Sequence, residues 1–290
     1  MTETQDRIAV ITDTEGDIPA GFADGLPIYT LPLRVTDGVR EFRDGVDITV
    51  DDVYRMQADC DFKTSLPGMD DIQAILDRIR ADGCNKVIVL ILSESLSSAT
   101  NLFRLIGREL EDLEMAVLNT KSASVGVGIL AVQTAKYIME GHPFSSVKAM
   151  AERLIENTSV FFSLDTLEYL KRGGRIGRVT ELVGSLLKIK PIITFGEVGT
   201  LSTAAKVHGS KAVPKHLLEC IRQLAEKRPG VPYNLVICDG GVPEAGDALK
   251  ADLLAALPDA RLVMHGQVDA TLAVHLGPHL LGAGIQFLEG

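Results

Sequence analysis

The sequence contains no tryptophan, and aromatic residues make up only 5% of its 290 residues. Binding sites for unpaired bases rely on stacking aromatic side chains, so a single-strand binder is a poor fit. Positive charge is also scarce, because 29 lysines and arginines stand against 39 aspartates and glutamates, giving a formal net charge of −10. An acidic protein repels phosphate backbones, and we therefore expect no nucleic-acid partner.

Cysteines and long apolar runs are equally sparse. The four cysteines are far apart, and no C-x-x-C pair occurs. This spacing argues against disulfides and a zinc site and favours a reducing cytoplasm. The longest strongly apolar run covers residues 87–92, which is far too short to span a bilayer, and residues 1–7 lack a signal-peptide pattern. We expect a cytoplasmic protein with no stable membrane span.

What the sequence does contain is an alternation of strand and helix patterns. Short apolar runs at residues 7–11, 27–35, 86–92 and 115–118 alternate with helical spacing up to residue 157. This order is typical of parallel βαβ units. The second half is more mixed, with a hairpin signal at residues 196–199. We predict a two-domain α/β protein: an N-terminal, parallel-sheet, Rossmann-like domain at residues 1–160 and a C-terminal mixed α/β domain at 161–290, with the boundary near residues 158–165.

Two clusters of hydroxyl side chains follow predicted sheet segments. Thr64 and Ser65 form one, and the other consists of Ser93, Ser95, Ser97 and Ser98. In open α/β sheets ligands gather at the carboxyl ends of strands, and a helix N-terminus favours anions. The clusters therefore suggest a cradle for a carboxylate. The alternative is that each hydroxyl only caps a helix.

The most distinctive segment is TLEYLKRGGRIGR at residues 166–178, in which paired glycines are flanked by basic side chains. Glycines permit positive φ and close approach of another group. Ten residues later the chain reads KIKPI at residues 188–192. Further short motifs are TDT at 12–14, DGVDI at 44–48, KTSLP at 63–67, SESLS at 93–97 and NTKSASVGVG at 119–128.

Together these motifs resemble those of the DegV family of bacterial fatty-acid-binding proteins, over residues 12 to 284. The resemblance implies a DegV-like fold that binds a long-chain fatty acid, with Thr64, Ser65 and Ser97 holding its carboxylate. We include Ser98 in this set, although Ser98 and Ala99 stand where the family has Gly and Thr.

The segment HLGP at residues 275–278 resembles the family's H-x-G-P-G, which implies that His275 approaches the carboxylate. Beside an anion a histidine favours its protonated form. His279 replaces the final glycine of the motif. His275 and His279 also stand four residues apart, but Gly277 and Pro278 make a helix there improbable, so we predict no metal site.

The resemblance also implies a partner. A separate fatty-acid kinase would phosphorylate the bound carboxylate, and the acyl-phosphate would enter phospholipid synthesis, so this chain would be a carrier and not an enzyme, with no cofactor. KVHGSK at residues 206–211 stands where the family has K-V-R-x-R-K, with His208 and Ser210 in place of arginines. We assign the handover to four basic residues: Lys206, His208, Arg172 and Arg175.

Two other functions remain open from the sequence. The chain could be a small-molecule acyl transferase or hydrolase with Ser97 as nucleophile and His275 as base, although no third orienting group is evident. It could also be a structural interaction module. A dinucleotide site at Gly126-x-Gly128 is disfavoured because no acidic residue follows about twenty residues later.

Overall fold

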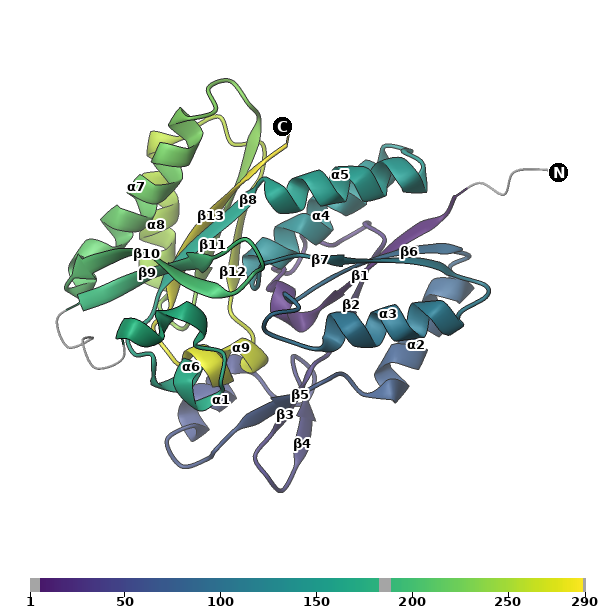
Figure 1. Cartoon of the computed structure of the whole chain (residues 1–290), viewed down its shortest axis with the longest axis horizontal. Coiled ribbons are helices and arrows are strands. Elements are labelled where there is room, and N and C mark those ends of the chain that lie inside the picture. Colours follow the sequence, from purple (N-terminus) through teal and green to yellow (C-terminus); the bar gives the residue numbers. More distant parts are fainter. Residues whose placement is uncertain (1–5, 183–188, 289–290) are drawn as a thin grey trace.

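The computed structural model describes residues 6–182 and 189–288, and its strands form three sheets (Figure 1). The first is a four-stranded sheet in the order β2-β1-β6-β7, and every neighbouring pair is parallel. Its strands are β1 (Ile8–Asp13), β2 (Ile28–Leu31), β6 (Lys86–Ile91) and β7 (Glu114–Asn119). The continuous apolar run of β6 is buried because helices cover both faces of this sheet, as predicted.

Helices α2 (Met69–Ala81) and α3 (Ala99–Glu109) cover one face of the parallel sheet, and α4 (Val125–Met139) and α5 (Phe144–Glu156) cover the other. The apolar spacing of α2 is the reason, because Ile72, Ile75, Leu76 and Ile79 all fall on its buried stripe. These four helices confirm the βαβ prediction for the first half of the chain.

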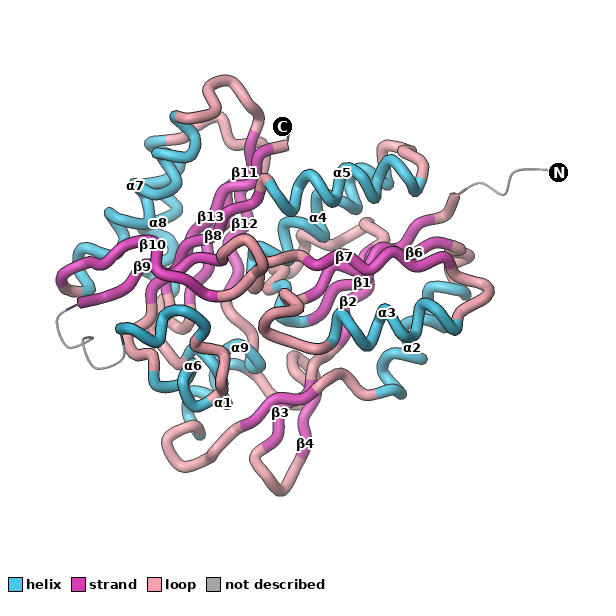
Figure 2. Tube along the Cα trace, viewed as in Figure 1, coloured by secondary structure: helices cyan, strands magenta, loops and turns pink. Residues whose placement is uncertain are grey.

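The second large sheet is mixed and has six strands in the order β10-β9-β8-β13-β11-β12 (Figure 2). Only β11 and β12 pair in parallel. The strands are β8 (Thr158–Ser163), β9 (Ile189–Phe195), β10 (Leu201–His208), β11 (Tyr233–Asp239), β12 (Val263–Gln267) and β13 (Leu281–Phe287). The predicted hairpin is confirmed as the antiparallel β9–β10 pair, while Lys188 of the KIKPI motif lies outside the described residues.

Helices α7 (Val213–Glu226) and α8 (Pro243–Ala256) pack on one face of the mixed sheet. Its other face meets α4, α6 (Glu168–Arg172) and α9 (Ala270–Leu276), so a hydrophobic core lies between the two large sheets. The described residues also form short 3-10 helices: η1 (Thr14–Gly16), η2 (Gly177–Leu182) and η3 (Ser210–Ala212). Within the described residues, no helix combines the length and apolar character that crossing a membrane requires.

A small antiparallel sheet departs from the sequence prediction. Strands β4 (Glu41–Arg43), β3 (Arg34–Thr36) and β5 (Lys63–Ser65) form it, together with α1 (Val50–Met56), which begins with a capping box between Thr49 and Asp52. The expected single strand at residues 27–35 is wrong, because Pro32 separates β2 from β3 and the two strands join different sheets. The KTSLP motif at residues 63–67 begins with β5.

The segment before Gly277 forms the seven-residue helix α9, so the expectation that no helix carries both His275 and His279 is confirmed. Its N-cap is Asp269, whose side chain accepts a hydrogen bond from the Leu272 N–H at 2.7 Å. Gly277, at φ 68°, ends the helix without preventing it. His275 is therefore helical and His279 is not.

Candidate functional site

A cavity of about 220 Å³ opens at the carboxyl end of the parallel sheet, where β1 and β6 lie side by side. The chain leaves these two strands toward opposite edges of the sheet, which makes this the point where open α/β folds bind ligands. Asp13, the last residue of β1, accepts a hydrogen bond from the Leu92 N–H at 3.3 Å and so ties the two strand ends together. The cavity extends from this point toward the mixed sheet.

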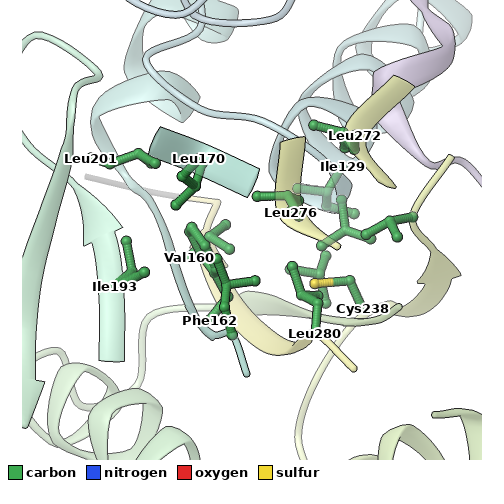
Figure 3. Close-up of a cluster of buried hydrophobic side chains, with 14 of the residues drawn as sticks. Ile129, Val160, Phe162, Leu170, Ile193, Leu201, Cys238, Leu272, Leu276 and Leu280 are labelled. Carbon is green, nitrogen blue, oxygen red and sulfur yellow. The ribbon is translucent and has the colours of Figure 1, made fainter. Parts of the chain in front are cut away.

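The walls of the cavity are mostly apolar and come from elements far apart in the sequence. Figure 3 shows several of them converging: Leu170 from α6, Leu272 and Leu276 from α9, and Val160 and Phe162 from β8. Leu201, Cys238 and Leu280 add the start of β10, β11 and the approach to β13. Such a lining suits a hydrocarbon chain, because each methylene that leaves water contributes about 0.8 kcal/mol.

Polar side chains gather at the solvent-facing end of this cavity. Ser65, Ser98 and Arg175 are exposed there, whereas Thr64 and Ser97 are half-buried just behind them. The cavity is thus polar where it meets water and apolar inside. This gradient matches a molecule with a charged head and an apolar tail.

The structure brings two of the predicted ligand residues into direct contact. The Thr64 hydroxyl and His275 Nε2 are 2.8 Å apart, although 211 positions separate them in the chain. Thr64 reaches this point from β5 of the small sheet and His275 from the last turn of α9. The location expected for Thr64, at the end of a parallel strand, is therefore wrong: antiparallel pairing with β3 positions it.

Glycines of two motifs set the position of His275. A Cβ at Gly173, in the paired-glycine segment, would overlap His275 Nδ1. A Cβ at Gly277 would overlap the ring of Tyr169, which belongs to the same segment as Gly173. The two motifs therefore need glycines because α6 and the end of α9 pack in direct contact.

The protein groups around His275 favour its neutral form. Burial, together with the nearby Arg175 and Arg172, lowers the pKa of this imidazole to about 4. His275 is therefore neutral at pH 7. Its Nδ1 is buried without a hydrogen-bond partner among the described residues, so Nε2 is the nitrogen that engages Thr64.

The serines of the loop after β6 have two different roles. Ser93 and Ser95 donate hydrogen bonds to the carbonyl oxygens of Gly199 and Val198, at 3.3 and 2.5 Å, and so join this loop to the β9–β10 turn. Ser97 lines the cavity, and its hydroxyl accepts a hydrogen bond from the Ala99 N–H at 3.2 Å.

Ser98 is the N-cap residue of α3 and also lines the cavity. In the described part of the chain, His275 is hydrogen-bonded to Thr64 and not to Ser97. The nucleophile–base pair that an acyl transferase or hydrolase needs is therefore not assembled in this arrangement.

The four predicted handover residues do not lie together. Arg175 lines the cavity, and its guanidinium donates hydrogen bonds to the carbonyl oxygens of Leu96 and Gly173. Arg172 stacks on Tyr169 and is exposed.

Lys206 and His208 are exposed near the far end of β10. Because Leu201 at the start of this strand lines the cavity, seven residues of strand place His208 roughly 20 Å away. Only Arg175 of the four is therefore at the cavity.

A buried acidic group beside the cavity was missed from the sequence. Burial and the neighbouring carboxyls raise the pKa of Glu15, Asp17 and Asp269 well above the usual range, and burial raises that of Asp13 to about 7. Glu15 lines the cavity. The sequence signal was present, since the turn TDTEGD at 12–17 carries three acids directly after a buried strand.

Two buried carboxyls, Asp17 and Asp44, hold the first turn of α9. Asp44 accepts hydrogen bonds from the Ala270 and Thr271 N–H groups, at 3.2 and 2.9 Å, and Asp17 accepts one from the Asp269 N–H at 2.8 Å. The free N–H groups at this helix start are thereby satisfied. Among the described residues, no three His, Cys, Asp or Glu side chains are arranged to hold a metal ion.

The Gly126-x-Gly128 segment has a packing explanation. A Cβ at Gly128 would overlap the carbonyl oxygen of Gly16, and one at Gly126 would overlap the Ser122 hydroxyl and press on Val160. Both glycines thus allow α4 to approach η1 and β8 closely.

Comparison with known proteins gives a consistent result. A model of the DegV family matches residues 7–288. A DegV domain-containing protein of Clostridium acetobutylicum is 32% identical over 281 residues, covering 97% of this chain and 99% of its own.

Among solved structures, a DegV family protein from Thermus thermophilus, described for its fatty acid binding, superimposes with a TM-score of 0.88 at 29% identity. It covers 97% of this chain and 99% of its own. DegV from Bacillus subtilis, described as a fatty acid binding protein, superimposes with a TM-score of 0.87 at 22% identity, with the same coverage, and supports the fold.

Proposed function

This chain belongs to the DegV family, and from that premise we propose that it binds one long-chain fatty acid in the cavity. The carboxylate is held at the polar end by Thr64, Ser97 and His275, with Ser65 and Ser98 beside them. The acyl chain extends along the apolar walls. The observation that carries this proposal is the Thr64–His275 hydrogen bond of 2.8 Å at the boundary between the polar and apolar parts of the cavity.

The hydrogen bonds of the cradle have a consistent direction. A threonine hydroxyl has one proton to donate, and in the proposed complex Thr64 donates it to the carboxylate. His275 is neutral at pH 7, so its Nε2–H donates to the Thr64 oxygen. The histidine thereby orients the hydroxyl, and Ser97 supplies a second donor to the anion.

The energetics favour a tightly held acid. Burying about 15 methylenes at about 0.8 kcal/mol each contributes roughly 12 kcal/mol before association and ordering costs offset several kcal/mol. Hydrogen bonds to the charged head add about 1.5–3 kcal/mol each before its desolvation. The tail therefore supplies most of the affinity, and the cradle selects an acid over an alcohol.

We further propose that a fatty-acid kinase is the partner and that this chain is its carrier in phospholipid synthesis. The cradle lies at the solvent-facing end, where a partner active site has access to the carboxylate. In this proposal Arg175, which lines the cavity, contacts an added phosphoryl group, and the exposed Arg172, Lys206 and His208 contact the partner. A cytoplasmic location and a division into domains at residues 1–160 and 161–290 are parts of the same proposal.

Mass spectrometry of the purified protein tests the binding function. Under native conditions we expect a one-to-one complex, and organic extraction should release a fatty acid. Ser97→Ala should weaken palmitate binding while leaving the corresponding alcohol nearly unaffected. Absence of any acyl species, together with no uptake of added palmitate or oleate, would reject the proposal.

A further inference from the structure

Two polar side chains lie in the buried part of the cavity. Glu15 and Thr271 both line the cavity, and each is only 2% exposed. Thr64, Ser97 and His275 are half-buried by comparison. Thr271 lies one turn before His275 on α9, so this part of the cavity adjoins the cradle on its buried side.

Both side chains have an unused hydrogen-bonding atom. Glu15 Oε2 and Thr271 Oγ1 are buried without a hydrogen-bond partner in the described structure. Buried polar atoms are nearly always paired, so each unpaired one needs an explanation. Asp13 Oδ1 and Asp269 Oδ2 are also unpaired, but neither residue lines the cavity. Glu15 and Thr271 do line it, as does His275, whose Nδ1 is unpaired, so a ligand in the cavity can reach the unused atoms of the pair.

The pair combines a carboxyl whose burial favours the neutral form with a hydroxyl. Burial raises the pKa of Glu15 well above its usual range, and Asp13, Asp44 and Asp17 raise it further, while Arg175 partly offsets them. A protonated carboxyl both donates and accepts hydrogen bonds, and so does the Thr271 hydroxyl. A ligand hydroxyl suits such a pair, because it can donate to one partner while it accepts from the other.

Resting on the proposed function, we propose that the natural ligand is a hydroxylated fatty acid whose chain hydroxyl is held by Glu15 and Thr271. Burial disfavours a further charged group at this depth, so the ligand group is neutral. A purely hydrocarbon chain would leave both polar atoms unsatisfied when the cavity fills. The pair therefore acts as a specificity determinant within an otherwise apolar lining.

The test compares stearic acid with a set of hydroxystearic acids that differ in hydroxyl position, using displacement of a fluorescent fatty acid. One net hydrogen bond changes affinity by roughly two- to tenfold, so we expect at least one isomer to bind about tenfold more tightly than stearate. Glu15→Leu should abolish this preference and bind stearate at least as well as the unaltered protein. Thr271→Val should reduce the preference, and Glu111→Leu, which changes an exposed acid, should retain it.

The outcomes separate the two proposals. If stearate binds and no hydroxylated isomer is preferred by more than twofold, the hydroxyl proposal is overturned while fatty-acid binding stands. The same holds if Glu15→Leu keeps the full preference. If the unaltered protein binds neither stearate nor any hydroxystearate, fatty-acid binding itself fails.

Discussion

Thr64→Val is the most direct test of the cradle. Valine has nearly the same shape as threonine and suits a strand, so β5 should keep its pairing with β3. The substitution removes the hydroxyl that lies 2.8 Å from His275 Nε2. It therefore removes one donor to the proposed carboxylate and leaves His275 with neither ring nitrogen paired, because Nδ1 already lacks a partner among the described residues.

Two magnitudes follow from this loss. A hydrogen bond to a charged group is worth about 1.5–3 kcal/mol, so palmitate affinity should fall roughly 10- to 150-fold. Leaving the buried Nε2 unpaired should cost about 1–3 kcal/mol of folding stability. For a protein of this size that corresponds to a decrease in Tm of roughly 2–12 °C.

The assay is displacement of a fluorescent fatty acid by palmitate and by hexadecanol, with Tm measured in parallel. Hexadecanol should lose much less affinity than palmitate, because it carries no anion. Thr64→Ser should restore most of the palmitate affinity. Thr36→Val, on the neighbouring strand of the same sheet, should leave it unchanged. An unchanged palmitate affinity, or equal losses for acid and alcohol, would refute a carboxylate role for Thr64.

Three further predictions follow from the same geometry. Gly173→Ala should displace His275 and weaken palmitate binding about tenfold in the displacement assay, whereas Gly174→Ala, which meets no neighbouring atom, should lower Tm but keep the affinity. The pKa of His275 falls from about 6.5 in the unfolded chain to about 4 in the fold, so its contribution to stability is complete above pH 6.5 and is lost as pH falls toward 4. Urea unfolding of His275→Gln across this range should show a shallower loss than the unaltered protein, and an identical slope would contradict the assignment. His208→Arg should speed acyl-phosphate formation with a kinase from a related system without changing acid affinity, and identical rates from pH 6 to 8.5 would remove His208 from the handover.

The sequence predicted the long elements of the fold well, for identifiable reasons. Strand β6 is a continuous apolar run, which a strand buried on both faces requires. The apolar spacing of α2 and the capping box at Thr49 are local signals that tertiary contacts reinforced. The short elements were missed because β5 has three residues and α9 has seven, which is too few for a hydrophobic period to show.

The candidate site was predicted only through the resemblance. Nothing in the spacing of Thr64 and His275 indicates that they meet, since one reaches the cavity from the small sheet and the other from α9. Glu15 was missed for a different reason. An acid in a polar turn after a strand is usually solvated, and the burial of this turn comes from α4, where Gly128 lies against Gly16.

Helix α9 connects the buried acids, at its first turn, to the cradle, at its last turn. Asp44 and Asp17 hold the first turn of α9 through its N–H groups, and Gly173 packs against His275 in the last turn. A seven-residue helix is only about 10 Å long, so fixing both ends leaves the imidazole little freedom beside Thr64. Burial raises the pKa of Glu15, Asp17 and Asp269 and so favours their neutral forms, which reduces the negative charge that an anion at the cradle meets although the chain carries a net charge of −10. The same burial that makes these carboxyls costly to ionise makes them compatible with an acidic ligand.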